Sequence, residues 1–331
     1  MRYFGSKVTT IDALYDLVSS RVPSGSFCDP FGGIGSVSSH FLSKGYTVWS
    51  GDVLSFAYYF QVSRLRFSPL LFSKLNLALG FEDCTDIAKH LNSLSPSDGW
   101  FVKEYSIKRQ FFSNNNAKKI QSCRLEIKRW AKNDFINHEA HAVLLAGLIN
   151  SMDKVANTAG TYYAYLKNWH RKALRDFNFG LVEPVHSEGK GFCFHEPADL
   201  LVKRGHFDVL YLDPPYNERS YPHYYHLAET IANETTPKVH GISGVPDKVS
   251  CSSRFNRPRD AKNSLSDLLG NAHFKLLVFH YADDGLIAPR EVRDILATYG
   301  NIEEFQLDCK GYTTKDIPRN AKHHLYLVRN V

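Results

Sequence analysis

The motif with the most specific chemistry in this sequence is Asp213-Pro214-Pro215-Tyr216, which directly follows the apolar run 207–212. Two consecutive prolines cannot continue a central strand, and their fixed φ angles set where the carbonyl oxygens point. The motif therefore holds two hydrogen-bond acceptors, a carboxylate and a rigid carbonyl, beside a ring that can stack on a planar group. In open α/β sheets, ligands bind at the carboxyl ends of strands, which is where this motif falls.

A second motif, the glycine-rich segment Asp29–Gly35, joins an apolar stretch at 26–29 to a helix predicted over 36–44. Its glycines let the backbone approach a ligand without a Cβ in between. Asp52 ends the next predicted strand, where an acid can accept hydrogen bonds from ribose hydroxyls. Because the spacing differs from the dinucleotide-binding Gly-x-Gly-x-x-Gly pattern, this turn taken alone also fits a purely structural role.

The elements around these motifs alternate between strand and helix. The stretches 26–29 and 46–50, with the helix between them, form a βαβ unit and imply a parallel sheet. Two buried strands, a helix and two further strands are expected at 207–212, 274–279, 289–299, 302–307 and 324–328. The predicted fold class is therefore α/β, with a doubly wound, mostly parallel sheet whose terminal strand is reversed.

Between residues 67 and 190 the pattern becomes mostly helical, with Leu144, Leu148, Met152 and Val155 on one helix face. We therefore expect a catalytic domain made of residues 1–66 plus 191–331. A helical lobe at 67–190 is expected to be inserted into it.

Positive charge is concentrated in this predicted lobe. The chain as a whole carries 40 Lys+Arg against 34 Asp+Glu, a net charge of +6. Nine basic and two acidic residues lie between 102 and 132, and five basic and no acidic residues between 154 and 175. With aromatic residues interspersed, this favours a polyanionic partner, although solvated helix faces would give the same pattern.

The candidate nucleic-acid contacts come from two segments. Lys118 and Lys119 lie in the first basic stretch. Arg254 and Arg257 lie in the segment 241–263, which is rich in Gly, Pro and Ser and is expected to be a long mobile loop.

Composition narrows the class further. The chain has 331 residues, 43% hydrophobic and 22% charged, which is typical of a globular protein. There is no run of 18 apolar residues, no apolar stretch behind the N-terminus, and no Cys-x-x-Cys pair among the six cysteines. The fifteen histidines show no metal-ligand spacing. We expect a cytoplasmic protein of prokaryotic or phage type, without a targeting signal, membrane association or metal.

Taken in order, the segments Arg2–Lys7, Asp29–Gly35 and Asp213–Tyr216 resemble the Dam-like (D12 class, α-group) DNA adenine-N6 methyltransferases. The residues after Tyr216, together with 156–162 and His280-Tyr281, are similar to the branch that includes the FokI-type modification enzymes. The resemblance covers essentially the whole α/β part and is much weaker over 67–150. It implies a Rossmann-like methyltransferase fold with S-adenosylmethionine as the cofactor.

The resemblance also implies which residues bind that cofactor. Tyr3 and Lys7 match the N-terminal motif that lies against it, Lys7 near its carboxylate, and the glycine-rich turn matches the segment under its methionine part. Asp52 matches the ribose acid, and Glu196 matches the acid near the adenine ring, with Asp199 as the alternative. The cofactor-binding candidates are Tyr3, Lys7, Asp29, Phe31, Gly33, Gly35, Asp52, Glu196 and Asp213.

The implied reaction is methyl transfer to N6 of an adenine flipped out of double-stranded DNA. Adenine N6 is a poor nucleophile because its lone pair is delocalised into the ring. The Asp213 carboxylate and the Pro214 carbonyl can bind both N6 hydrogens, which favours a pyramidal nitrogen and frees the lone pair. Tyr216 can stack on the extruded base. The catalytic candidates are therefore Asp213, Pro214, Pro215 and Tyr216.

Three alternatives remain open. An RNA adenine-N6 methyltransferase would favour aromatic stacking platforms over a helical basic lobe. Cytosine N4 poses the same chemical problem, although Asp213 is more typical of the adenine enzymes. A catalytically silent DNA-binding subunit would be expected to have lost one of the two motifs, and both are intact. The sequence also leaves room for a cognate restriction endonuclease in a restriction-modification system.

Overall fold

The computed structural model describes residues 1, 3, 7, 9–249, 253–310 and 320–330. The chain divides into two compact units. The sheet unit consists of Lys7–Val53, Val185–Ser220 and Ser252–Val331, and the helical unit of Met1–Ser6, Leu54–Pro184 and Tyr221–Cys251.

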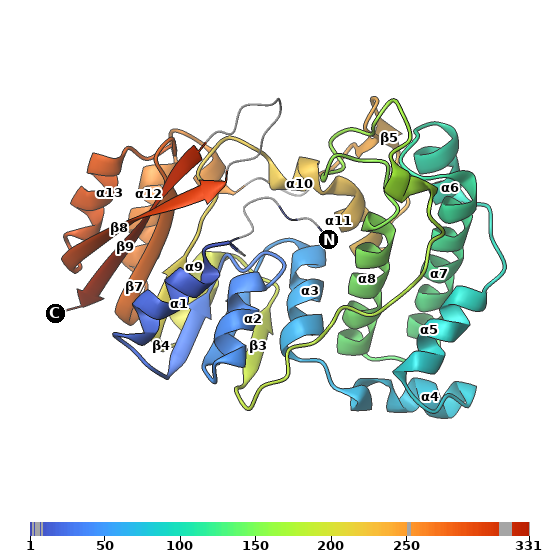
Figure 1. Ribbon diagram of the computed structural model, residues 1–331, viewed down its shortest axis with the longest axis horizontal. Coiled ribbons are helices and arrows are strands. Elements are labelled where there is room, and N and C mark those ends of the chain that lie inside the picture. Colours follow the sequence, from blue (N-terminus) through green and yellow to red (C-terminus); the bar gives the residue numbers. More distant parts are fainter. Residues whose placement is uncertain (2, 4–6, 8, 250–252, 311–319, 331) are drawn as a thin grey trace. The chain divides into compact units, whose positions relative to one another are not determined.

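The sheet unit is built on seven strands in the order β3-β2-β1-β4-β7-β9-β8 (Figure 1). Neighbouring strands from β3 through β7 are parallel, and β9 runs antiparallel to both β7 and β8. This confirms the predicted mostly parallel α/β sheet, in which the reversed strand is β9, the last strand that the structure describes. The strands are β1 (Ser26–Asp29), β2 (Thr47–Gly51), β3 (Gly191–Phe194), β4 (His206–Leu212), β7 (His273–Ala282), β8 (Gly300–Lys310) and β9 (Asn320–Asn330).

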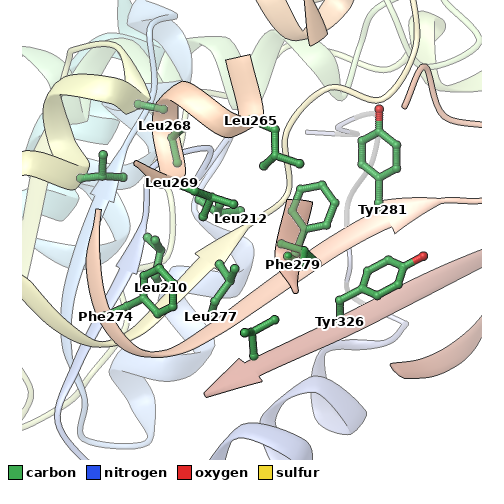
Figure 2. Close-up of a cluster of buried hydrophobic side chains, with 14 of the residues drawn as sticks. Leu210, Leu212, Leu265, Leu268, Leu269, Phe274, Leu277, Phe279, Tyr281 and Tyr326 are labelled. Carbon is green, nitrogen blue, oxygen red and sulfur yellow. The ribbon is translucent and has the colours of Figure 1, made fainter. Parts of the chain in front are cut away.

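Helices cover both faces of this sheet, as a doubly wound fold requires. On one face, Phe41 of α2 stacks on Phe27 of β1 with ring centroids 3.9 Å apart, and α1 packs on α2. On the other face, a hydrophobic cluster joins the sheet to a second group of helices (Figure 2). The helical elements of the sheet unit are α1 (Ile11–Ser19), α2 (Ser36–Ser43), α9 (Ala198–Leu201), η4 (Val202–Arg204), η5 (Arg254–Asn256), α12 (Ala261–Leu269) and α13 (Pro289–Leu296).

The segment expected to be a long mobile loop, 241–263, contains short elements of secondary structure in its described residues. A two-stranded hairpin, β5 (Val239–His240) and β6 (Val245–Pro246), lies in the helical unit. In the sheet unit, Phe255 of η5 is buried in the hydrophobic cluster, and Ala261 already begins α12.

The helical unit centres on α8, which is buried along most of its length and packs against α3, α7 and α11. Leu144, Leu148 and Met152 are fully buried, which confirms the predicted core stripe. No helix in the described ranges is both long and apolar enough to span a membrane. The elements are α3 (Ser55–Leu65), η1 (Pro69–Phe72), α4 (Ser73–Leu79), α5 (Cys84–Ser93), α6 (Trp100–Val102), η2 (Lys103–Ile107), α7 (Asn114–Lys132), α8 (His138–Asp153), η3 (Arg171–Leu174), α10 (Tyr221–Tyr224) and α11 (His226–Ala232).

The helical unit is larger than the lobe predicted at 67–190, because it also takes in α3 and the segment from Tyr221 to Cys251. A carboxylate on α11 links this helix to α3 within the unit. Glu229 on α11 accepts hydrogen bonds from the backbone N–H groups of Ser55 at 3.1 Å and Phe56 at 3.2 Å. These N–H groups at the start of α3 have no partner within their own helix, so Glu229 fastens α3 to α11.

Candidate active site

Asp213 follows the last residue of β4 and forms an ion pair with the N-terminal segment. Lys7 Nζ donates to Asp213 Oδ2 at 2.5 Å, and the two side chains are only 5% and 16% exposed. Burial raises the pKa of Asp213 above its usual value, and the positive charge of Lys7 works against that rise. Lys7 therefore favours the ionised carboxylate in a site that would otherwise favour its protonation.

The glycine-rich turn takes the backbone geometry that its sequence demands. Gly33 has φ 51° and Gly35 has φ 77°, in the left-handed region that side chains with a Cβ rarely adopt. The backbone N–H of Gly33 donates to Asp52 Oδ2 at 3.1 Å, which ties this turn to the end of β2. Asp29, at the end of β1, is buried, and its Oδ2 accepts from Ser38 Oγ at 2.7 Å.

Three carboxylates gather at one point of the sheet. Burial raises the pKa of Asp29 to about 7, and the nearby charges of Asp213 and Asp52 add to that rise. These three acids follow or end the neighbouring strands β2, β1 and β4, and the direction of winding changes between β1 and β4. The structure thus brings the two sequence motifs together at the topological switch point, where doubly wound folds bind ligands.

Tyr216 lies at the same edge of the sheet. Its backbone carbonyl accepts from Leu286 N at 2.9 Å, and its ring meets the rings of Tyr281 and His323 edge to face. Pro214 is buried and Pro215 half-buried, so the two prolines join the core to the site.

The remaining cofactor candidates lie in different surroundings. Phe31 is half-buried and packs edge-on against Phe255, with ring centroids 5.3 Å apart. Glu196, just after β3, forms an ion pair with Arg204 at 2.6 Å. Tyr3 belongs to the helical unit, where its ring stacks on Tyr225 at 5.2 Å. Of the N-terminal motif, only Tyr3 and Lys7 are described; Arg2 and residues 4–6 lie outside the described residues.

The four predicted nucleic-acid contacts all have partners within their own unit. Lys118 forms an ion pair with Asp98 at 3.0 Å, and Lys119 donates to the carbonyls of Asn92 and Leu94 near the C-terminal end of α5. In the sheet unit, Arg254 pairs with Asp267 and Arg257 with Asp260. The structure brings Lys118 and Lys119 together on α7, and Arg254 and Arg257 on and just after η5, as two separate pairs.

Sequence reasoning missed two features of the site. It placed Lys7 near the cofactor and gave no hint of its bond to Asp213, since a contact across 206 positions leaves no local pattern. It also left His280 without a role. His280 is buried between Tyr211 and His323, with hydrogen bonds of 3.1 Å to each. The pattern that could have revealed it is the placement of two histidines within strands that are otherwise apolar.

No group of three or more His, Cys, Asp or Glu side chains in the described ranges is arranged to hold a metal ion. The cysteines that the structure describes in full, Cys28, Cys84, Cys123 and Cys193, are free thiols.

The fold and these motifs agree with the protein comparisons. The model of the D12 class N6 adenine-specific DNA methyltransferases matches residues 3–295, so the chain belongs to this family. This confirms the predicted family.

Three relatives illustrate the match. The type II methyltransferase M.FokI of Planomicrobium okeanokoites is 29% identical over 99% of this chain and 52% of its own length. M.NlaIII of Neisseria lactamica is 30% identical over 98% of this chain and 95% of its own length. M.CviAII of Paramecium bursaria Chlorella virus 1 is 28% identical over 98% of this chain and 97% of its own length. The chain thus spans about half of M.FokI and nearly all of the other two.

Proposed function

We propose that this chain transfers the methyl group of S-adenosylmethionine to N6 of an adenine in double-stranded DNA, at a specific sequence. The observation that carries the proposal is the position of Asp213. This carboxylate is held by Lys7 beside the glycine-rich turn, at the switch point of the sheet. Family membership and the relatives' names as type II methyltransferases support the same activity.

The residues at the switch point fit the proposed cofactor. When bound, S-adenosylmethionine supplies an electrophilic methyl group on a positively charged sulfur. Asp29, Asp52 and Asp213 bring three carboxyl groups to this part of the sheet unit, which suits a ligand with a sulfonium and an ammonium group. Gly33 and Gly35 keep the turn free of side chains, and Asp52 is the residue proposed to hold the ribose hydroxyls.

The target amine would be activated by hydrogen bonding. We assign the Asp213 carboxylate and the Pro214 carbonyl as the acceptors of the two N6 hydrogens, with geometry fixed by the proline pair. The ionised carboxylate of Asp213 is the stronger acceptor, and the ion pair with Lys7 offsets part of the effect of its burial. Tyr216 would stack on the extruded base, while Pro215 fixes the direction in which that ring leaves the sheet.

The test uses the purified protein, S-adenosylmethionine with an isotopically labelled methyl group, and unmodified DNA. We expect labelled N6-methyladenine after digestion to nucleosides, at one short sequence when the product is sequenced with methylation-sensitive detection. Parallel reactions contain single-stranded RNA as substrate, or the Asp213→Ala protein. Label in RNA alone would favour the RNA enzyme, label on cytosine N4 would change the target base, and no transfer at all would favour a silent subunit.

The partners follow from the same proposal. Double-stranded DNA is the substrate, and Lys118, Lys119, Arg254 and Arg257 stay candidate contacts to it. The relatives' designation as type II methyltransferases favours a cognate restriction endonuclease that recognises the same sequence. Digestion of methylated and unmethylated DNA with extracts of the source cells would reveal such an activity.

A further inference from the structure

The ring of Tyr216 is held by two other rings that come from opposite faces of the sheet. Its centroid lies 5.5 Å from that of His323, with an interplanar angle of 85°, and 6.1 Å from that of Tyr281, with an angle of 77°. Edge-to-face contacts of this kind have a preferred geometry and contribute beyond simple burial. The orientation of Tyr216 thus depends on how firmly His323 and Tyr281 are themselves fixed.

His323 is fixed by a buried chain of hydrogen bonds. Its Nδ1 lies 3.1 Å from His280 Nε2, and His280 Nδ1 lies 3.1 Å from the hydroxyl of Tyr211. Burial lowers the pKa of His323 to about 4 and that of His280 well below its usual value, so both rings are neutral. A neutral imidazole has one donor and one acceptor nitrogen, so His280 uses both of its ring nitrogens in these two bonds, whichever tautomer it adopts.

Tyr281 is fixed from the other face. Its ring stacks on Phe279 with centroids 5.2 Å apart, which joins it to the hydrophobic cluster (Figure 2). Its hydroxyl accepts from the backbone N–H of Ile287 at 3.2 Å, and the neighbouring Leu286 N–H donates to the Tyr216 carbonyl. One short loop therefore bonds to both tyrosines.

Gly285 allows this loop to lie flat against Tyr281. A Cβ at position 285 would stand 2.2 Å from a carbon of the Tyr281 ring, and that ring is only 2% exposed, so it has little room to move. Side chains alternate between faces along a strand, so Tyr281 and His280 point to opposite sides of β7. The two supports of Tyr216 are thus built on separate faces and can be removed separately.

We propose that His323 and Tyr281 are positioning residues that fix the ring of Tyr216 in the orientation that stacks on the target base. This inference rests on the proposed function for the meaning of that orientation, but the support of the ring is a property of the protein alone. His280 and Tyr211 act through His323, and Gly285 acts through Tyr281. None of these residues needs to touch the base or the cofactor.

The first experiment measures the ring directly, without any reaction. Fluorotyrosine is incorporated at position 216 alone, and its fluorine NMR signal is recorded in the free protein. We expect His323→Ala and Gly285→Ala each to shift that signal by more than its linewidth, with His323→Phe closer to the unaltered protein. His273→Ala, an exposed histidine at the opposite end of β7, is the matched control and should leave the signal in place. An unchanged signal in both test variants would overturn the proposal.

The second experiment asks whether His323 acts through Tyr216 in catalysis. Misplacement of a reacting group by about an ångström can cost roughly a hundredfold in rate, so His323→Ala should lower kcat by about tenfold to a hundredfold. Its KM for S-adenosylmethionine should stay within about twofold, and in a Tyr216→Ala background the same change should have almost no further effect. Losses that simply multiply would show that His323 does not act through Tyr216.

The two experiments separate this inference from the proposed function. A fluorine signal that responds as expected, in a protein that methylates no DNA, supports the positioning of the ring and overturns the proposed activity. Normal methylation with a signal that does not respond supports the activity and overturns the positioning role. Thermal unfolding of each variant identifies loss of folding, and Gly285→Ala, which disturbs Tyr281 on the other face, retains the test if His323→Ala does not fold.

Discussion

Charged side chains serve different purposes in the two units of this protein. In the sheet unit, Asp29, Asp52 and Asp213 are drawn together at the switch point, where their mutual repulsion and burial are offset only in part by Lys7. In the helical unit, several basic residues of α7 donate to backbone carbonyl groups. Arg124 donates to the carbonyl of Thr235 at 2.7 Å, and Lys128 to that of Glu234 at 3.2 Å.

This difference shows which kind of charge marks a functional site. A carboxylate cluster is unfavourable for folding, so its presence in a well-packed sheet calls for a ligand or a reaction to explain it. A lysine that caps a helix stabilises the fold by itself and needs no external partner. The basic count of the helical unit is therefore weaker support for a DNA surface than the sequence suggested, whereas the acids of the sheet unit are strong support for a site.

Among variants that test this difference between the two units, we expect the largest loss of activity from Asp213→Ala. Removing one preorganised electrostatic partner typically lowers kcat by about 10²–10³. Loss of the ion pair with the buried Lys7 costs some stability, so thermal unfolding is measured first to show that the variant is folded. Methyl transfer to DNA is measured with labelled cofactor, and binding of the cofactor by calorimetry. Near-normal turnover in this variant would remove Asp213 from the catalytic role.

Asp52→Ala should affect binding more than chemistry. Hydrogen bonds to a charged group contribute about 1.5–3 kcal/mol, so the binding free energy of S-adenosylmethionine should weaken by that amount and its Kd should rise accordingly. The loss of the acceptor for Gly33 N–H contributes to the same change, since the turn is no longer tied to β2. Calorimetry measures the Kd, with Asp294→Ala, an exposed acid on α13 of the same unit, as the control. An unchanged Kd would assign Asp52 a purely structural role.

Replacement of Tyr216 separates stacking from the hydroxyl group. Stacking of a base on an aromatic ring is worth about 1–3 kcal/mol, so Tyr216→Ala should lose most activity while Tyr216→Phe retains much of it. A mismatch at the target adenine lowers the cost of extrusion and should partly rescue Tyr216→Ala. Emission from 2-aminopurine at the target position reports extrusion. Equal activity of the Ala and Phe variants would exclude Tyr216 as the stacking platform, with Tyr221 and Tyr224 the next residues to test.

The sheet could be predicted from the sequence because its signals are local. The apolar runs at 207–212 and 274–279 became β4 and β7, and the glycine turn has the backbone angles that its glycines allow. The meeting of Asp29, Asp52 and Asp213 also followed, because the carboxyl ends of parallel strands lie at one edge of a sheet.

The parts that could not be predicted depend on contacts between distant residues. The Lys7–Asp213 ion pair, the chain from Tyr211 to His323, and the bond from Glu229 to the start of α3 each join segments far apart in sequence. The boundaries of the helical unit could not be predicted for the same reason, since they depend on how α11 packs and not on composition. A count of charges has the same limit, because it does not show whether a lysine faces a phosphate or a helix end.

The smallest expected effects come from the two neighbouring lysines of α7, which test the basic surface itself. Lys119 donates to two carbonyl groups near the end of α5, at 3.1 and 2.6 Å, so Lys119→Gln should destabilise the fold by about 1–3 kcal/mol in chemical denaturation. Lys118 pairs instead with Asp98, whose side chain is 73% exposed, and such surface pairs contribute about 0–1 kcal/mol, so Lys118→Gln should leave stability almost unchanged.

For DNA binding we expect the larger effect from Lys118, because only a weakly held lysine can exchange its partner for a phosphate at little cost. If Lys118 contacts the backbone, Lys118→Gln should reduce the slope of log Kd against log salt by about 0.9 and weaken binding to all sequences alike. Lys119→Gln should leave that slope unchanged once its loss of stability is taken into account. A slope that changes in Lys119→Gln and not in Lys118→Gln would contradict this assignment. If both variants keep the slope of the unaltered protein, the DNA-binding surface lies away from this part of α7.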